Sequence, residues 1–456
     1  MTEDPMLKRL ARKLDDESLL FTKFANYASG DVALEFVAPE IRKATEDRLQ
    51  TLHVPWPRLV IGAIEERLTI TGFRGSRDEP ANAELWDIWQ DNNLDELSIL
   101  AHVEALTYGR AFALVWADDT GKPTITVESA RQCAVLFDPA SRKVVAGLKR
   151  WVADGRGQAV VFTPTVIRRF TTNSDVIEGG NNTPGSLEGA TWDLSADVIP
   201  NPLGMVPLVP LVNRPSISKP DGISELADLI PTFDALTKLS SDLMVSSEFL
   251  ASPRRWATGL TLEEERDDND VPTGDIDEGN NFSDLPGRLW MAEDPQARFG
   301  QFDAADLSGF VNSLSMLKRD LSSVASLPPT YVGQFGDVPS SADAIRSAES
   351  SLVATARRKA MTFGGAWETV MRIAHAIEVG YWSPDLQRLE VMWANFETRT
   401  MAQAMDAATK GVQSEILDPD FAAEKFLDMS PTEIERNAEA RRRRGIEDVA
   451  RQAIAG

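Results

Sequence analysis

The sequence predicts an α+β protein whose last third is helical. Apolar residues recur at helical spacing over the first hundred residues, alternate with a period of two between about residues 110 and 170, and return to helical spacing from about residue 224. The chain has 456 residues, 43% of them hydrophobic. That length suits about two to four domains, each able to bury a core.

The first elements are expected to be helices. Leu7, Leu10, Leu14 and Leu19 follow helical spacing within a charged lead-in over residues 1–30. Further helices are expected at about 39–52, 59–68, 81–90 and 94–108, with a short strand at 68–73. Gly109 stands where a glycine would cap the last of these helices.

The next segment is expected to form a sheet. Residues 111–116 and 124–127 flank the turn 118–121 and predict a hairpin. Further strands are expected at 134–137, 144–152, 159–163 and 166–170. Residues 171–220 are rich in turns, and Pro207 and Pro210 confine the apolar run 206–212 to a sheet edge or an irregular extension.

A long amphipathic helix is expected from about Ser224 to the Ser252-Pro253 pair. It would have about seven turns and a length of roughly 40 Å, with Pro231 in a first turn or at a kink. Its apolar stripe includes Leu229, Phe233, Leu236 and Leu243. Because this helix has few local partners, we expect neighbouring copies of the chain to cover the stripe.

The remaining chain is expected to be helical at about 303–326, 340–380 and 395–417. Leu327-Pro328-Pro329 ends the first of these, and Gly364-Gly365 is a weak point in the second. The last helix should reach about residue 454. Its start is indicated by Ser430-Pro431-Thr432-Glu433, with a capping serine, proline at the first helical position and glutamate at the third.

The charge of the chain is strongly acidic, with 47 basic and 70 acidic residues and a formal net charge of −23. This argues against a sequence-independent DNA clamp, which needs lysines and arginines to neutralise phosphates. It is compatible with an acidic channel wall along which DNA slides, or with the simpler alternative of a soluble acidic surface. Residues 261–285 contain ten acids and one base, and are expected to form a mobile acidic loop.

Catalytic and metal-binding motifs are missing from the sequence. His53, His102 and His375 are scattered, and Cys133 is the only cysteine, so no zinc cluster is expected. The acids from Asp275 onward do not follow the EF-hand pattern, and the sequence contains no phosphate-binding loop. We expect packed or surface histidines, a buried thiol, no metal, no cofactor and no catalytic residue.

Two features leave alternatives open. The run Arg441, Arg442, Arg443 and Arg444 either forms a solvated face that neutralises Glu433, Glu435 and Glu439 or contacts phosphate. A metal-dependent nuclease using Asp267, Asp268 and Asp270 is the unlikely enzymatic alternative, since two-metal sites usually spread their carboxylates over rigid strands. No apolar run has the length of a membrane helix, and the sequence indicates a protein made in a reducing cytoplasm.

Several short stretches, in one order along the chain, resemble the phage portal family, the head–tail connectors of tailed double-stranded-DNA phages. They are most similar to portals of phages of high-GC Gram-positive hosts. The stretches are Asn26-Tyr27-x-x-Gly30, Trp56-Pro57-Arg58-Leu59-Val60 through Gly72-Phe73-Arg74, Gly109-Arg110-Ala111-Phe112, Val209-Pro210-Leu211-Val212-Asn213-Arg214-Pro215, Pro253-x-x-Trp256-Ala257-x-Gly259, Leu327-Pro328-Pro329-x-Tyr331-x-Gly333 and Ser340-Ser341-Ala342-x-Ala344-Ile345-Arg346.

The resemblance implies a portal-like subunit with an α+β wing, long stem helices, a small β-containing clip and a helical C-terminal crown. It implies a wing at 1–195, a clip-like segment at 196–220, a stem helix at 221–256, and a wing return with acidic and tunnel loops at 257–302. A channel-side helix and linker would follow at 303–339, and the crown would cover 340–456. The clip would be short for this family.

The resemblance also implies a non-enzymatic function. Copies of the chain, usually twelve, would form a ring at one capsid vertex of the virion, assembled in the host cytoplasm. Double-stranded DNA would pass through without sequence recognition during packaging and ejection. Partners would be the terminase large subunit, the major capsid and scaffold proteins, and a head-completion or adaptor protein, without a membrane. Another capsid or connector protein is the alternative.

Five basic residues that follow the long helix in the chain are candidates for the DNA channel. They are Arg254, Arg255, Arg288, Lys318 and Arg319. The expectation rests on their positions after the long helix.

Overall fold

The structure is a computed structural model of the chain. It describes residues 4–32, 54–75, 81–172, 187, 190–195, 198–251, 255–258, 264–266, 272–276, 296, 298–301, 306–334, 342–397, 401–427, 429 and 433–444. The chain divides into two compact units. Unit 1 comprises Met1–Val32, Pro55–Phe233 and Arg319–Gly456, and unit 2 comprises Ala33–Val54 and Asp234–Lys318.

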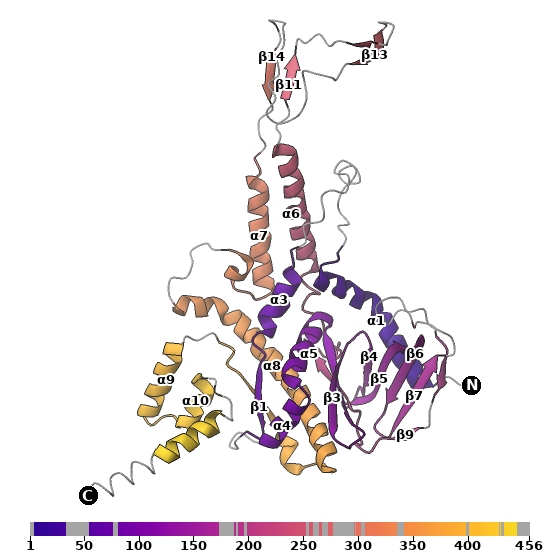
Figure 1. Ribbon diagram of the computed structural model, residues 1–456, viewed down its shortest axis with the longest axis vertical. Coiled ribbons are helices and arrows are strands. Elements are labelled where there is room, and N and C mark those ends of the chain that lie inside the picture. Colours follow the sequence, from indigo (N-terminus) through magenta and orange to yellow (C-terminus); the bar gives the residue numbers. More distant parts are fainter. Residues whose placement is uncertain are drawn as a thin grey trace. The chain divides into compact units, whose positions relative to one another are not determined.

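Unit 1 is built on sheets of antiparallel strands (Figure 1). The six-stranded sheet contains β4 (Cys133–Phe137), β5 (Val144–Ala153), β6 (Arg156–Phe162), β7 (Val166–Thr172) and β8 (Trp192–Leu194) in that order, and β9 (Ile199–Pro200) pairs with β7. A three-stranded sheet has the order β10 (Leu208–Val212), β2 (Arg110–Ala117), β3 (Pro123–Glu128). These strands confirm the hairpin and the strands expected up to residue 170.

The apolar run with two prolines is an edge strand, as expected. In β10, Pro210 stands opposite Phe112 of β2, and no further strand among the described residues pairs with β10. An edge tolerates proline because the missing N–H is not needed for a second ladder. Leu208 and Leu211 are nevertheless completely buried, so β10 belongs to the core of unit 1.

The helices of the first hundred residues lie close to the expected places. They are α1 (Pro5–Ser29), α3 (Trp56–Glu65), α4 (Ala83–Asp91) and α5 (Leu94–Tyr108). The Asp4 side chain caps α1, and Gly109 ends α5 with a positive φ of 90°. Leu7, Leu10 and Leu14 are buried, whereas Leu19 is 85% exposed, so the buried stripe of α1 does not include Leu19. The helix expected at 39–52 lies outside the described residues.

The last third of the chain differs in two ways from the expectation of helices alone. The helix α8 (Ala342–Val379) runs through Gly364 and Gly365 without a break and packs on β10, β2, β3, α3 and α4. The strand β15 (Glu390–Trp393) then pairs with β1 (Ile70–Arg74) in a two-stranded sheet. The helices α9 (Met401–Gln413) and α10 (Pro419–Leu427) follow, and residues 433–444 are helical.

The core of unit 1 gathers aromatic side chains from distant parts of the chain. Trp89, Trp367 and Phe73 are completely buried, and the rings of Trp89 and Trp367 meet edge to face with centroids 5.2 Å apart. This contact joins α4 to α8, so these two tryptophans anchor the core of unit 1.

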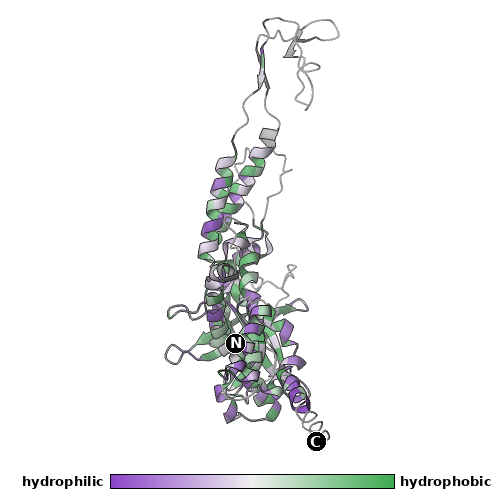
Figure 2. Ribbon diagram, turned by 90° about the vertical axis from the view of Figure 1, so that its left-hand side faces the viewer, coloured by the Kyte–Doolittle hydropathy of each residue, from purple (hydrophilic) through white to green (hydrophobic). Residues whose placement is uncertain are grey.

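Unit 2 consists mainly of two helices and the segment between them. These helices are α6 (Ile230–Ala251) and α7 (Ser308–Val324), whose first and last turns respectively belong to unit 1. Figures 1 and 2 both show α6 and α7 side by side, and Figure 2 shows hydrophobic and hydrophilic residues interspersed along both. Between them, β11 (Arg255–Thr258) pairs with β14 (Arg298–Gln301), and β12 (Glu264–Arg266) pairs with β13 (Pro272–Ile276).

The expected long helix begins later than the sequence indicated. Residues 225–229 form turns and α6 starts at Ile230, which places Pro231 in the first turn. With 22 residues the helix is roughly 33 Å long, and not 40 Å. Similarly, α7 begins at Ser308. Residues 264–266 and 272–276 of the acidic segment form strands, and the rest of that segment lies outside the described residues.

Candidate functional site

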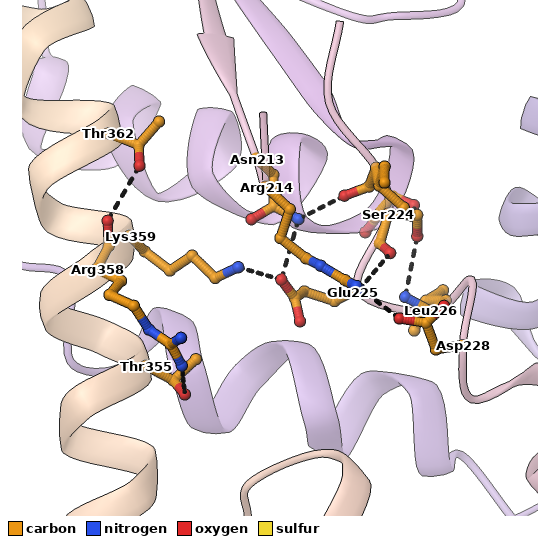
Figure 3. Close-up of polar contacts among 12 residues, drawn as sticks. Asn213, Arg214, Ser224, Glu225, Leu226, Asp228, Thr355, Arg358, Lys359 and Thr362 are labelled. Carbon is orange, nitrogen blue, oxygen red and sulfur yellow. Dashed lines mark hydrogen bonds and ion pairs between the residues drawn. The ribbon is translucent and has the colours of Figure 1, made fainter. Parts of the chain in front are cut away.

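A connected polar site in the described chain lies in unit 1, where β10 ends and the chain continues toward α6. We call it the α6-start cluster and define it by Asn213, Arg214, Ser224, Glu225 and Lys359 (Figure 3). The first four come from the segment between β10 and α6, and Lys359 comes from α8.

The backbone of this segment is held against the end of α5. The Asn213 N–H donates to the Gly109 carbonyl at 2.8 Å, and the Ile223 N–H donates to the Asn213 carbonyl at 2.9 Å. Gly222 has a φ of +84°, and a Cβ atom there would lie 2.4 Å from the carbonyl oxygens of Asn213 and Gly109. Only glycine allows so close an approach of the two backbones.

Side chains then fix the turns before α6. The Ser224 hydroxyl donates to the Thr107 carbonyl at 2.6 Å and accepts from the Leu226 N–H at 3.0 Å. The Asn213 amide donates to the Ile223 carbonyl at 2.8 Å and to the Glu225 carboxylate at 3.1 Å. These bonds satisfy backbone N–H and C=O groups that have no helical hydrogen-bond partner before α6 begins at Ile230.

An ion pair between Lys359 and Glu225 connects α8 to this segment (Figure 3). Their side chains are 8% and 14% exposed. Burial lowers the pKa of Lys359, while the Glu225 carboxylate beside it opposes that effect. A buried charge is tolerated only with such a partner, so the pair positions α8 against the start of α6.

The outer edge of the cluster is more exposed. Arg214 pairs with Asp228 at 2.6 Å, and these side chains are 36% and 57% exposed. Arg358 donates to the Thr355 hydroxyl at 3.2 Å. The buried acid and base already pair with each other, so the cluster offers positioning and not acid–base chemistry.

The sequence contains a signal that Lys359 has a buried partner. Leu352, Ala356, Ala360 and Phe363 form the buried stripe of α8, and Lys359 lies on that stripe. A charged residue within an apolar helical stripe indicates a buried partner elsewhere in the chain. Asn213 and Arg214 were noted only as part of the resemblance.

Three of the five expected channel residues lie within the described part of the chain. Arg254 and Arg288 lie outside the described residues. Arg255 is the first residue of β11, opposite Gln301. Lys318 and Arg319 are consecutive residues of α7, where Lys318 is half-buried and Arg319 is exposed. Their role in a channel stays a prediction.

The expected interface stripe is largely covered by the chain itself. Leu229, Phe233 and Leu236 are 2%, 2% and 1% exposed, whereas Leu243 is half-buried. The expectation that sister copies cover the first three is therefore corrected, because no surface of these side chains is left for another copy. Leu243 and the more exposed Met244 still have surface that another copy could contact.

The arginine run divides into one half-buried residue and three exposed ones. Arg441 pairs with Asp420 of α10, and Arg443 lies 3.6 Å from Glu439 one turn earlier. The second pair fits the expectation of a solvated face that neutralises glutamates. Arg442 and Arg444 are exposed, and a phosphate contact stays untested.

Two of the residues considered for metal or nucleophilic chemistry, Cys133 and His102, are buried in the structure. Cys133 is buried, which raises the pKa of its thiol, so it fits the expected structural role. His102 is also buried, whereas His53, Asp267, Asp268 and Asp270 lie outside the described residues. Within the described ranges, no group of three or more His, Cys, Asp or Glu residues could hold a metal ion. No helix there has the length and apolar character needed to cross a membrane.

Comparison with known proteins gives matches that span most of the chain. A family model described as "Phage portal protein, SPP1 Gp6-like" matches residues 21–446. The portal protein of Mycobacterium phage L5 is 31% identical over 427 residues, which cover 90% of this chain and 82% of that protein. The portal protein of Mycobacterium phage D29 is 33% identical over 376 residues, covering 78% and 72%.

A solved structure, "Virion of native gene transfer agent (GTA) particle", also contains a similar chain. The TM-score is 0.42 and the identity 12%, with 86% of this chain and 94% of that chain covered. A likeness at this score assigns no role to any single element.

Proposed function

Since this chain belongs to the SPP1 Gp6-like family of phage portal proteins and has a portal role in a phage capsid, we propose that its copies form a closed ring, of about twelve, at one capsid vertex. Double-stranded DNA passes through this ring during packaging and ejection. The observation that carries the proposal is the family match over residues 21–446, nearly the full chain.

The helix pair α6 and α7 is the candidate for the stem of the subunit. The chain runs out along α6 and back along α7, and β11 and β14 pair in the segment between them. This segment is a better candidate for the clip than residues 196–220, because β10 of that range is buried in the core of unit 1. We assign the docking of the terminase large subunit, and later of a head-completion or adaptor protein, to residues 252–307.

The α6-start cluster supports a positioning role for Lys359 and Glu225 within unit 1. Their ion pair and several side-chain bonds hold α8 and the segment before α6 in one geometry. We therefore assign Lys359 and Glu225 the role of fixing that segment against α8. The net charge of −23 favours a channel along which DNA slides without being bound tightly.

The portal proposal also makes the chain a structural component and not an enzyme. The scaffold and major capsid proteins are its proposed partners during assembly. The nuclease alternative is tested by incubating the purified protein with DNA and magnesium. We expect intact DNA, and magnesium-dependent cleavage that is lost in Asp267→Ala/Asp268→Ala/Asp270→Ala would contradict the structural assignment.

The ring is tested by the mass and appearance of the purified protein. Twelve copies of the 50.1 kDa chain give a particle of about 600 kDa. We expect this mass by light scattering and a central hole in negative-stain class averages. A protein that stays a monomer at every concentration and salt condition, also in the presence of scaffold protein, would contradict the proposal. A closed assembly without a hole would favour another connector protein.

A further inference from the structure

A pocket of about 780 Å³ lies in unit 1 among α4, β3 and the end of α8. Five carboxylates and one lysine line it, namely Glu84, Asp87, Asp91, Asp118, Glu378 and Lys122. All five carboxylate residues are exposed. These carboxylates therefore face open solvent and do not pair with basic side chains in the core.

Two helix ends add to this negative charge. The helix α4 ends at Asp91 and α8 ends at Val379, both on the pocket wall. Neither helix has a basic residue in its last turn. The carbonyl ends of helices carry partial negative charge that cations normally neutralise, so this pocket has two uncompensated ends beside its carboxylates.

His375 is a buried polar group on the pocket wall that has no hydrogen-bond partner among the described residues. It is 8% exposed, and its Nε2 faces Glu84 Oε2 at 3.9 Å, which is too far for a hydrogen bond. Its Nδ1 is fully covered and has no partner within the described part of the chain. The Nε2 side of the ring is therefore the side through which a bound ligand can satisfy His375.

The floor of the pocket is rigid. The Asn92 side chain donates to the carbonyls of Ile88 at 2.9 Å and Pro123 at 3.2 Å, and it accepts from the Ile125 N–H at 2.8 Å. These bonds tie the end of α4 to β3, so the spacing of the carboxylates is set before any ligand binds. Such preorganisation lowers the entropic cost of binding.

The pocket suits extended cationic side chains better than a metal ion. Within the described residues no three metal-binding side chains converge, and the carboxylates are spread around a wide opening. Arginine binds carboxylates and carbonyl groups with several donors in a planar fork. A segment with consecutive arginines would therefore match the charge of the pocket.

The chain itself presents such a segment. Arg442, Arg443 and Arg444 are exposed in the helical residues 433–444, and the Arg443 side chain is 79% exposed. In a closed ring every copy faces a neighbour through two different surfaces, so an acidic surface on one side is favourably matched by a basic surface on the other.

We propose that the acidic pocket formed by α4, β3 and the end of α8 receives the Arg442–Arg444 run of the neighbouring copy. This inference rests on the proposed ring. It assigns one of the contacts between neighbouring copies that close the ring. The contact fixes the register between copies through charge pairs at the rim, where arginines neutralise the ends of α4 and α8.

Cysteine cross-linking between two differently substituted chains tests the contact. One chain carries Asp91→Cys and the other carries Arg443→Cys. The native Cys133 is buried and does not react. After co-expression and treatment with a short bismaleimide, we expect a product of twice the 50.1 kDa chain. The control pairs Arg443→Cys with Asp16→Cys, a 69% exposed side chain on α1, and should give roughly tenfold less product.

The outcomes separate this contact from the ring itself. Rings without the cross-linked product overturn the contact and leave the portal assignment intact. A link that forms only within one chain carrying both cysteines places the arginines in their own pocket and also overturns the proposal. Wild-type protein that never assembles overturns both the ring and the contact.

Charge reversal gives a second, independent measurement. Two triple variants are compared, Asp87→Lys/Asp91→Lys/Glu378→Lys and Arg442→Glu/Arg443→Glu/Arg444→Glu. Each should weaken assembly by about tenfold or more, and a chain that carries both sets should recover most of the lost assembly. These residues are exposed, so circular dichroism should show unchanged folding. Failure of the combined variant to recover assembly, while both single sets weaken it, would count against direct pairing.

Discussion

At the scale of single residues, His102 shows how the core changes the chemistry of a side chain. The imidazole is fully buried, stacks on Phe363 with centroids 5.2 Å apart, and accepts a hydrogen bond from Trp367 Nε1 at 3.0 Å. Burial lowers its pKa from 6.5 to about 3. The sequence predicted a packed or surface histidine, but aromatic partners more than 260 positions away could not be inferred from local spacing.

This pKa predicts a loss of stability in mild acid. The unfolded chain protonates His102 below about pH 6.5, whereas the folded chain does so only near pH 3. The stabilisation is therefore present above pH 6.5 and is lost as pH falls toward 3, by about 2 kcal/mol between pH 6.5 and 5. Urea unfolding at pH 7, 6 and 5 measures this loss.

His102→Gln is the matched variant for this prediction. Glutamine can still accept from Trp367 but does not titrate, so its free energy of unfolding should fall less between pH 7 and 5. The variant starts from a lower stability because it loses the stacking on Phe363. Parallel pH profiles for the two proteins would show that another group causes the loss.

At the scale of secondary-structure elements, local patterns predicted the strands between residues 110 and 172 well. Their alternation is regular, and Gly121 and Gly155 mark turns with positive φ. The start of α6 was placed too early because Leu226, Leu229, Ile230 and Phe233 are all buried, whether the backbone is turned or helical. Apolar spacing alone does not separate these two conformations.

The strand β15 was missed for a different reason. It has four residues, and its partner β1 lies more than 300 positions earlier in the chain. So short a segment has no measurable period, and only the free edge of β1 makes it a strand. The partner of Lys359 was likewise beyond local inference. Its place on the apolar stripe of α8 indicates a buried partner, but Glu225 lies more than 130 positions earlier in the chain.

Two glycines give predictions of opposite sign for the change in the free energy of unfolding. Gly365 is exposed inside α8, and an added Cβ would meet nothing within 4 Å. Gly365→Ala should raise the free energy of unfolding by about 1 kcal/mol, because alanine restricts the unfolded chain and favours helix. Urea unfolding at pH 7 measures the change.

Gly222→Ala is the counterpart, expected to lower stability by about 3 kcal/mol through backbone strain and collision with two carbonyl oxygens. Equal effects of the two substitutions would contradict the assigned backbone conformations. If Gly222→Ala raised the free energy of unfolding, the backbone conformation assigned to the segment before α6 would be contradicted.

At the scale of the whole molecule, the division into two units determines which parts can be removed. Unit 1 assembles residues from both ends of the chain around one core, and β10 and α8 are central to it. The resemblance alone assigned 196–220 to the clip and 257–302 to the wing. In the structure, residues 234–318 belong with residues 33–54 to unit 2, and the assignment of wing and clip stays a prediction.

Excision distinguishes these two assignments. Replacing residues 252–307 by a short Gly-Ser turn joins α6 to α7 and leaves unit 1 complete, so its free energy of unfolding should change by less than about 0.5 kcal/mol. The matched variant replaces 206–212, which removes the fully buried Leu208 and Leu211 and should abolish cooperative unfolding. Denaturation followed by circular dichroism compares the two.

The first variant should still assemble into rings but no longer bind the terminase large subunit, because the docking segment is gone. If it unfolds without cooperativity while the second remains folded, the core of unit 1 has been assigned to the wrong part of the chain.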